Sequence, residues 1–174
     1  MNEYHPSKVL KYCPYCGSAR FTWDGVKSFA CADCQKKLFI DAASAVAVII
    51  ENDRGEIILT RRAYNPSKGA LDLPGGFVDL SECAEDAARR EVKEELGLDI
   101  TELRYIASFP NEYLYGGLLI YTLDMAFVAK VANSDNLVAA DDVASASYFR
   151  PDAIPFDEIA FESIKNILKF YTHT

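Results

Sequence analysis

The sequence predicts an α/β protein in two parts, a small cysteine-rich module in residues 1–40 and a larger domain in residues 41–174. Two closely spaced cysteine pairs lie in the first part. The second part alternates runs of β-branched and aromatic residues with stretches whose apolar residues have helical spacing. The charge balance changes as well: residues 1–40 carry six Lys or Arg and three Asp or Glu, whereas the rest carries twelve and twenty-three.

The composition of the whole chain is typical of a globular protein, because half of the 174 residues are hydrophobic and a quarter are charged. No apolar run approaches the roughly 18 residues that a membrane span needs. The first residues also contain no apolar signal core, so we expect a cytoplasmic protein without a membrane partner. The net charge of −8 repels nucleic acid and free phosphates unless cations intervene, which argues against a nucleic-acid partner.

The first part contains two C-x₂-C pairs separated by fourteen residues, and their members are Cys13, Cys16, Cys31 and Cys34. Four thiolates at about 2.3 Å from one Zn²⁺ close a tetrahedral shell and leave no open position for chemistry. A segment this small lacks the core to fold unaided, so metal binding would supply its stability. We therefore predict a zinc ribbon, with short strands at 20–23 and 27–30.

The same cysteines leave two alternatives open, a pair of disulfides or a redox dithiol. A cytoplasmic setting disfavours disulfides, and a redox pair needs only one C-x₂-C motif. The charge of the module is small once four thiolates and one Zn²⁺ are counted. Beyond folding, this favours a role in protein interaction or in forming a homodimer over nucleic-acid recognition.

After a short link at 38–44, two strands are predicted at 46–50 and 56–61, around a turn with strong hairpin chemistry. The second strand leads Arg61 and Arg62 toward a glycine-containing loop. In so acidic a domain these arginines are candidates for contacts with a substrate phosphate or ribose. The alternative is a pair of surface charges.

The stretch 76–98 carries the strongest chemical signal of the chain. Its apolar residues recur every fourth position, which predicts a helix that Gly97 ends. Glu91, Glu94 and Glu95 stand at i, i+3 and i+4, so their side chains share one helix face. Crowded carboxylates repel one another, and oxygen-only clusters suit hard cations such as Mg²⁺, which completes its shell with waters and substrate phosphates.

This stretch resembles the Nudix box, and all nine specified positions are filled: Gly76, Glu82, Arg90, Glu91, Val92, Glu94, Glu95, Gly97 and Leu98. The resemblance implies a Nudix-type α/β/α sandwich with a mixed sheet. It implies hydrolysis of a nucleoside diphosphate linked to another group, with Mg²⁺ or Mn²⁺. The implied metal ligands are the Gly76 carbonyl oxygen, Glu91, Glu94 and Glu95. Glu82 would support the site, and Arg90 would orient the acids through an ion pair.

A zinc ribbon before a Nudix box is similar to the NADH pyrophosphatase group. That group follows its box with a Ser-Gln-Pro-Trp-Pro-Phe-Pro-like signature, and the aligned stretch here is Ser-Phe-Pro-Asn-Glu-Tyr-Leu at 108–114. Ser108 and Pro110 match, and Tyr113 is an aromatic replacement, but the glutamine, the tryptophan and the later prolines are missing. A looser assignment, a dinucleotide or nucleotide-sugar pyrophosphatase, fits these residues.

The chain after the box predicts strands at 104–109 and 118–131, with a loop rich in tyrosine and glycine between them. In that loop Tyr113 is a candidate for stacking on a base or nicotinamide ring, and ordinary packing is the alternative. A last short strand at 148–149 and an amphipathic helix from residue 157 onward would close the sandwich.

Acids beyond the box are further candidates. In Nudix enzymes an acid roughly fifty residues beyond the Glu-Glu pair often serves as a metal ligand or base. Asp141 and Asp142 lie at about this distance, and Glu112 is a rival. The alternative for each is a solvated loop carboxylate.

Three functions fit these residues. The first is attack by water on one phosphorus of a pyrophosphate, with Glu94, Glu95 or a late-loop acid as the base. The second is a nucleotide sensor that binds its ligand without cleaving it. Loss of an acid from residues 90–95 would have favoured the sensor, and none is lost. The third is a clean-up hydrolase of damaged nucleoside triphosphates, which would release pyrophosphate instead of two monophosphates.

Overall fold

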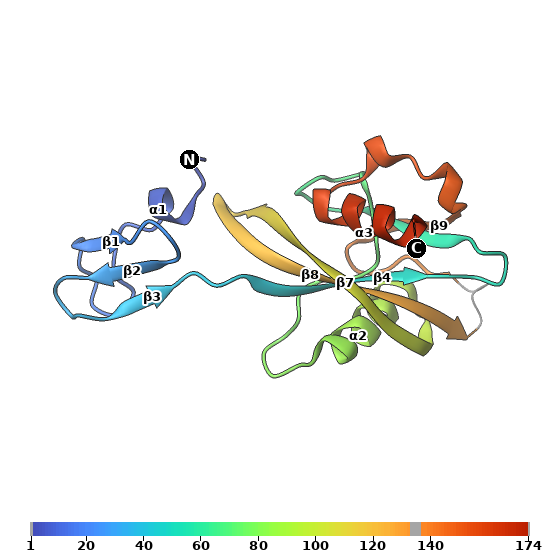
Figure 1. Cartoon of the computed structure of the whole chain (residues 1–174), viewed down its shortest axis with the longest axis horizontal. Coiled ribbons are helices and arrows are strands. Elements are labelled where there is room, and N and C mark those ends of the chain that lie inside the picture. The colour runs from blue at the N-terminus through green and yellow to red at the C-terminus, as the bar shows by residue number, and fades with distance from the viewer. Residues whose placement is uncertain (1, 133–136, 174) are drawn as a thin grey trace. The chain divides into compact units, whose positions relative to one another are not determined.

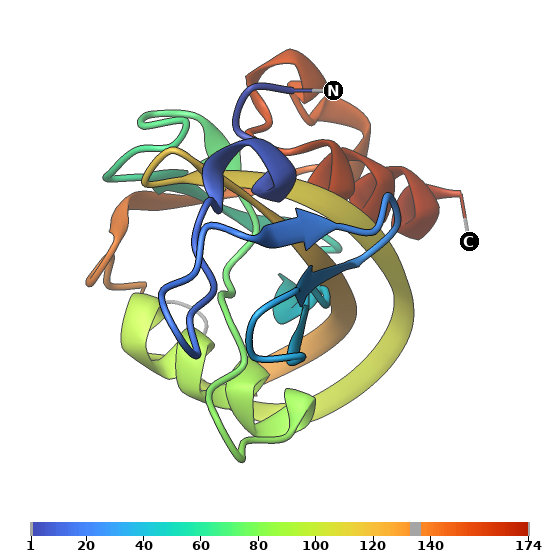
Figure 2. The same cartoon turned by 90° about the vertical axis from the view of Figure 1, so that its left-hand side faces the viewer.

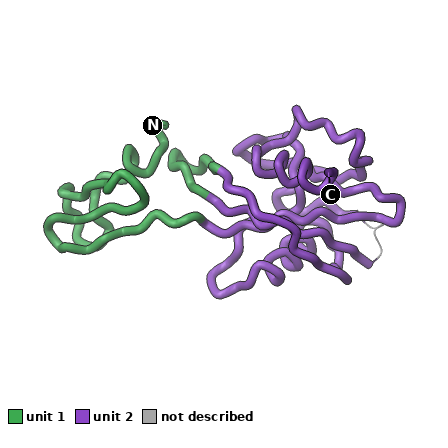
Figure 3. The backbone as a smooth tube through the Cα atoms, viewed as in Figure 1, with its two compact units in different colours: residues 1–42, 112–121 green, residues 43–111, 122–174 purple. Residues whose placement is uncertain are grey.

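The computed structural model describes residues 2–132 and 137–173 (Figure 1). The polar segment expected at 133–147 therefore begins with residues that lie outside the described ranges. The chain forms two compact units, residues 1–42 with 112–121 and residues 43–111 with 122–174 (Figure 3). None of the described helices is long and apolar enough to cross a membrane.

The smaller unit contains a short helix, α1 (Pro6–Val9), and an antiparallel sheet of β1 (Phe21–Trp23), β2 (Ser28–Cys31) and β3 (Lys37–Phe39). These elements are blue in Figure 2. Asp24 shapes the β1–β2 turn, because its carboxylate accepts hydrogen bonds from the backbone N–H groups of residues 26, 27 and 28. The prediction of an irregular link from residue 38 was wrong for its first residues, since they pair with β2 as a third strand.

The larger unit is built around β4 (Ala43–Ile50), which pairs in parallel with β8 (Leu118–Ala132). The neighbour of β8 on its other side is β7 (Asp99–Tyr115), and a two-residue turn joins the two strands. A second set of strands has β5 (Ile57–Arg62) between β6 (Leu71–Asp72) and β9 (Val143–Phe149). Parallel and antiparallel pairs coexist, so the predicted mixed sheet is confirmed.

Two helices cover opposite faces of these strands, α2 (Ala84–Leu96) and α3 (Glu162–Thr172) (Figure 1). Alternate residues of β4 point to opposite faces. Ala47 and Ile49 belong to the core cluster that contains the apolar face of α3, whereas Val46, Val48 and Ile50 belong to the cluster under α2. The predicted α/β/α sandwich is therefore confirmed, with one core on each side of the strands.

The structure corrects the expected elements in three places. The turn at 52–55 forms, but β4 and β5 enter different ladders and share only an isolated bridge, Glu51 with Ile57. The last strand begins at residue 143 instead of 148. The final helix begins at Glu162, after two single-turn 3₁₀ helices, Pro151–Ala153 and Phe156–Glu158.

A further correction concerns the loop expected at 110–117, which is mostly strand. β7 runs to Tyr115, and Gly116 and Gly117 alone make the turn, with φ angles of 58° and 78°. Both φ angles are positive, as a tight hairpin turn matching the twist of its strands requires, and glycine adopts them without strain. Tyr113 therefore lies on a strand, near the tip of a long hairpin.

Candidate functional site

The acidic face of α2 is graded in exposure. The side chain of Glu94 is 48% exposed and that of Glu91 only 13%, while Glu95 is buried, with 4% of its surface exposed. The surroundings of Glu95 are polar: it lines a small pocket with Thr60, Arg62, Asp72, Asp142, Gly75, Leu73 and Val143. Buried Glu95 therefore faces a polar pocket between α2 and the strands, and not the apolar core.

The glycine loop before α2 brings backbone groups against these acids. The Gly75 N–H donates to the Glu95 carboxylate at 3.1 Å, and the Gly76 carbonyl accepts from the Val46 N–H at 2.8 Å. Gly75 has a φ of +147°, and a Cβ there would lie 2.0 Å from the Val46 carbonyl oxygen. A Cβ on Gly76 would lie 2.6 Å from a carboxylate oxygen of Glu91. Both positions need glycine because of this close approach.

Arg90 connects most of the acids of the box. Its guanidinium makes two parallel 2.9 Å hydrogen bonds to Glu82 and also donates to Glu91 at 2.7 Å and Glu94 at 3.1 Å. It donates as well to the Phe77 carbonyl at 3.1 Å, on the chain leading to α2. Hydrogen bonds from Arg90 lower the pKa of Glu82, and the carboxylates raise the pKa of Arg90. The arginine thus holds the helix, the preceding loop and the acids in one arrangement.

Of the three late-chain acids, the structure places Asp142 beside the acids of α2. Asp142 lines the same small pocket as Glu95, and its carboxylate contributes to the raised pKa of Glu95. Burial raises the pKa of Glu95 to about 10, with further contributions from Asp142 and Glu91. Asp141 is exposed, at a φ of 54°, and Glu112 belongs to the other compact unit.

A β-bulge next to the site sets the position of Asp142. In the β5–β9 ladder, Arg61 pairs with Ser145 but Arg62 pairs with Val143, so Ala144 is an extra residue. The Ala63 N–H donates to the Asp142 carbonyl at 2.7 Å and fixes the chain just before the bulge. Bulges re-aim side chains near active sites, and this one brings the end of β9 to the buried acid of α2.

The two candidate arginines lie in different environments. Arg61 is 40% exposed and pairs on the surface with Glu158 at 2.6 Å. Arg62 is half-buried at the polar pocket, where it pairs with Asp72 at 2.9 Å and donates to the Pro66 carbonyl at 2.8 Å. Its guanidinium also lies over the ring of Phe161, 5.0 Å from the centroid.

Asp72 is the site residue to which the sequence assigned no role. It is 8% exposed, and burial raises its pKa to about 6, although the Arg62 cation acts in the opposite direction. A polar residue between two leucines is also what simple strand alternation produces. The one feature of the sequence that could have indicated a role for Asp72 is the pair of arginines on β5, the strand that pairs with β6.

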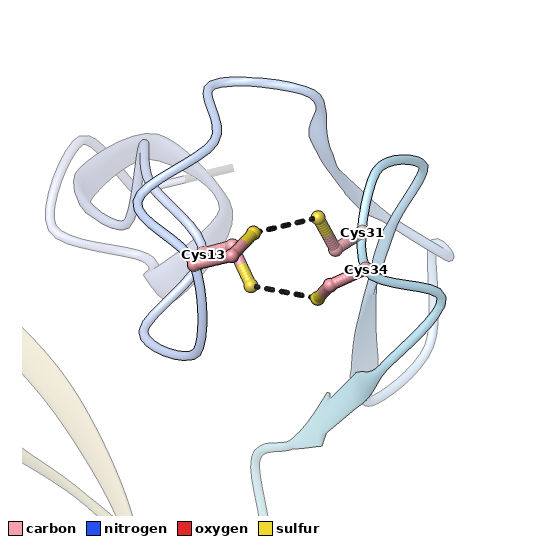
Figure 4. A group of neighbouring side chains, drawn as sticks. Cys13, Cys31 and Cys34 are labelled. Carbon is pink, nitrogen blue, oxygen red and sulfur yellow. Dashed lines mark hydrogen bonds between the residues drawn. The ribbon is translucent and has the colours of Figure 1, made fainter.

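The four cysteines of the smaller unit converge on one point (Figure 4). All four sulfur atoms lie within 4.8 Å of one another, and two cross-pairs, Cys13 with Cys34 and Cys16 with Cys31, are 3.7 and 3.6 Å apart. Tetrahedral zinc with bonds of about 2.3 Å requires sulfur separations of about 3.8 Å. The sulfur geometry therefore fits one zinc ion, and a pair of disulfides is absent among these cysteines.

Comparison with known proteins identifies the family. Residues 41–170 match the model of the NUDIX domain. The ADP-ribose pyrophosphatase of Methanocaldococcus jannaschii is 36% identical over 137 residues, which cover 78% of this chain and 76% of that protein. The chain belongs to the NUDIX family.

Other NUDIX proteins resemble the chain over more of its length. The NAD-capped RNA hydrolase NudC of Escherichia coli is 28% identical over 145 residues, 83% of this chain but 53% of that protein. The chain thus spans about half the length of this relative. A NUDIX hydrolase from Nitrosomonas europaea has the same fold, with a TM-score of 0.71, 24% identity and coverage of 94% of this chain and 91% of the other.

The carboxylates of the NUDIX box fit a divalent cation. Burial raises the pKa of Glu95, and a cation bound there would replace its proton and neutralise the carboxylate. Outside the four cysteines, no three metal-binding side chains in the described part of the chain bring their ligand atoms within 4.8 Å of one another. Mg²⁺ needs only one or two protein carboxylates, because it keeps several waters and takes oxygen ligands from substrate phosphates.

We predict that one zinc ion binds per chain and that replacing a ligand abolishes binding. Cys31→Ser should lower the zinc content, measured by mass spectrometry of the metal, from one per chain to near zero and unfold the smaller unit. Cys83→Ser is the matched control, since Cys83 lies outside the cluster. Loss of zinc in both variants, or in neither, would contradict the assignment.

We also predict that Glu95→Gln stabilises the metal-free protein at pH 8. The pKa of Glu95 is raised from an ordinary value near 4.3 to about 10, so this carboxyl group ionises in the unfolded chain while it stays protonated in the folded protein. The free energy of unfolding therefore falls as the pH rises from about 4 to about 10. Glutamine keeps an acceptor for Gly75 without the charge. The Tm at pH 8 should rise by a few degrees, about 2–4 °C for each kcal/mol, with no gain at pH 4. A lower Tm at pH 8 would refute the predicted cost.

Proposed function

We propose that this NUDIX protein hydrolyses the pyrophosphate bond of a nucleoside diphosphate linked to another moiety, such as ADP-ribose, a dinucleotide or a nucleotide sugar. The observation that carries the proposal is that buried Glu95 and Asp142 line one pocket beside the glycine loop, in an acidic domain that needs a cation to accept phosphates. The names of the relatives, an ADP-ribose pyrophosphatase and an NAD-capped RNA hydrolase, support the same type of bond.

The proposed ligands of Mg²⁺ or Mn²⁺ are the Gly76 carbonyl oxygen, Glu91, Glu94 and Glu95. The bound cation would supply neutralisation of the phosphoryl oxygens and a lower pKa for the attacking water. Arg90, held by Glu82, orients the carboxylates of Glu91 and Glu94 through the hydrogen bonds described above. Glycine at position 76 leaves room for the Glu91 carboxylate, which lies 2.6 Å from where a Cβ would stand.

The base that removes the proton from water would be Glu94, Glu95 or Asp142. Asp142 has one advantage over the other two, because it is exposed to solvent and lines the same pocket as Glu95. It would take the proton from water and release it to solvent. Among the described residues, Asp141 and Glu112 do not line this pocket, and neither is proposed as the base.

Several other assignments also stay proposals. We place a zinc ribbon in residues 1–40 and the hydrolase domain in residues 41–174, and we expect a cytoplasmic protein without a nucleic-acid partner. We also propose that the zinc ribbon serves protein interaction or the formation of a homodimer. Tyr113 is retained as a candidate contact for a base or nicotinamide ring.

A product-resolved hydrolysis screen tests the proposed function. ADP-ribose, NADH, NAD-capped RNA, nucleotide sugars and nucleoside triphosphates would each be incubated with Mg²⁺ and with Mn²⁺. We expect two monophosphate products from a linked diphosphate. Pyrophosphate released from triphosphates would indicate the clean-up hydrolase, and tight binding without any product would indicate the sensor.

We predict that the acids of the box control turnover. Glu94→Gln or Glu95→Gln should lower kcat by on the order of a hundredfold or more, the scale of losing a main electrostatic element. Glu85→Gln is the matched control, because Glu85 is an exposed acid in the first turn of the same helix. Wild-type turnover of both site variants at saturating Mg²⁺ would show that the assignment is wrong.

We predict that Arg62, and not Arg61, affects substrate affinity. Arg62→Leu should raise KM by about tenfold or more, whereas Arg61→Leu, on the surface, should change it less than twofold. Arg62→Leu also leaves Asp72 buried without its ion-pair partner, a loss of roughly 3–5 kcal/mol in stability.

The double variant Arg62→Leu/Asp72→Leu separates the two effects, because it removes both charges. Its Tm should return toward that of the wild type while its KM stays high. A KM that recovers together with the Tm would mean that Arg62 acts only on folding.

A further inference from the structure

The tip of the β7–β8 hairpin is packed on the zinc-binding part of the chain. Residues 112–121 belong to the same compact unit as residues 1–42. The Leu119 N–H donates to the Tyr4 carbonyl at 2.9 Å, and Leu119 is buried. The ring of His5 meets the ring of Tyr121 edge-on, with centroids 6.1 Å apart.

His5 connects this tip to the core of the zinc ribbon. Its ring also lies edge-on to the ring of Trp23, with centroids 5.4 Å apart. His5 is fixed in place because its side chain accepts a 3.1 Å hydrogen bond from the Ser7 N–H and caps α1. Trp23 in turn packs on Phe29, 4.9 Å between ring centroids, at the centre of the unit.

That core is too small to persist without metal. Its core cluster contains four buried residues, Cys13, Phe21, Phe29 and Cys31, and two of these four carry ligand sulfurs. A unit of roughly fifty residues with such a core depends on metal for its folding free energy. Loss of zinc would therefore disorder Trp23 and His5, and the hairpin tip would lose the surface on which it packs.

We propose that the zinc ribbon is a metal-dependent clamp for the β7–β8 hairpin tip, with His5 as the positioning residue between them. When zinc is bound, the tip is held through Leu119 and Tyr121. When zinc is lost, the tip is released while the NUDIX sandwich stays folded, since both core clusters of the sandwich lie outside the smaller unit.

The clamp also sets the position of two aromatic residues, exposed Tyr115 and partly buried Tyr113. Tyr113 and Tyr115 lie on the tip, with their rings stacked at 6.3 Å between centroids. Zinc occupancy would thus control where these rings are presented. The inference does not depend on the proposed hydrolysis, because it concerns the order of the tip.

Amide hydrogen exchange in the full-length protein, followed by NMR, tests the clamp. The decisive signal is the Leu119 N–H, because its acceptor, Tyr4, belongs to the N-terminal segment. After zinc is removed with a chelator, exchange at Leu119 should accelerate at least tenfold. The amides of Val92 in α2 and Leu168 in α3 should keep their rates. An unchanged rate at Leu119 in protein shown to be free of zinc would overturn the proposal.

His5→Ala tests the positioning role with zinc in place. The variant should keep one zinc per chain, shift the emission of Trp23, the only tryptophan, and accelerate exchange at Leu119 at least threefold. His173→Ala is the matched control, because His173 is the only other histidine and lies at the end of α3. Wild-type exchange at Leu119 in His5→Ala, or loss of its zinc, would contradict the role given to His5.

Discussion

The repulsion among carboxylates that are held close together in a poorly solvated place is the constraint on which the site depends. Glu95 is buried, and the carboxylates of Asp142 and Glu91 raise its pKa further. Arg90 offsets part of this charge from the outer side of the helix, where it pairs with Glu82, Glu91 and Glu94. We propose that a divalent cation supplies the remaining positive charge, so that the cost of assembling the acids becomes a source of metal affinity.

The fold positions the acids because backbone segments from the glycine loop and from β9 lie close to α2. The glycine loop lies so close to β4 and α2 that side chains at positions 75 and 76 would collide with Val46 and Glu91. On the other side, the bulge in β9 turns Asp142 toward Glu95. Both devices belong to the scaffold, so the acids are pre-positioned before a substrate arrives.

Local patterns in the sequence predicted the parts of the structure that local interactions decide. The nine box positions identified the helix and its acids, and the spacing of four cysteines identified the zinc ribbon. The sequence did not predict the burial of Glu95, the choice of Asp142 over Asp141, or the pairing of Arg62 with Asp72. These depend on the register of β5 with β9 and on contacts between residues far apart in the chain. The hairpin was misjudged because a loop rich in tyrosine and glycine has the same composition as two strands around a Gly-Gly turn.

Titration calorimetry of Mn²⁺ binding, repeated in buffers of different ionisation enthalpy, tests the central claim most directly. The account predicts that zinc-loaded protein at pH 8 releases about one proton for each Mn²⁺ bound, because the raised pKa of Glu95 keeps a proton on that carboxyl group until the cation displaces it. In Glu95→Gln that release should vanish and the affinity should fall at least tenfold. Mn²⁺ binding with no proton release, or with equal affinity in the variant, would contradict the claim that these acids hold the catalytic cation.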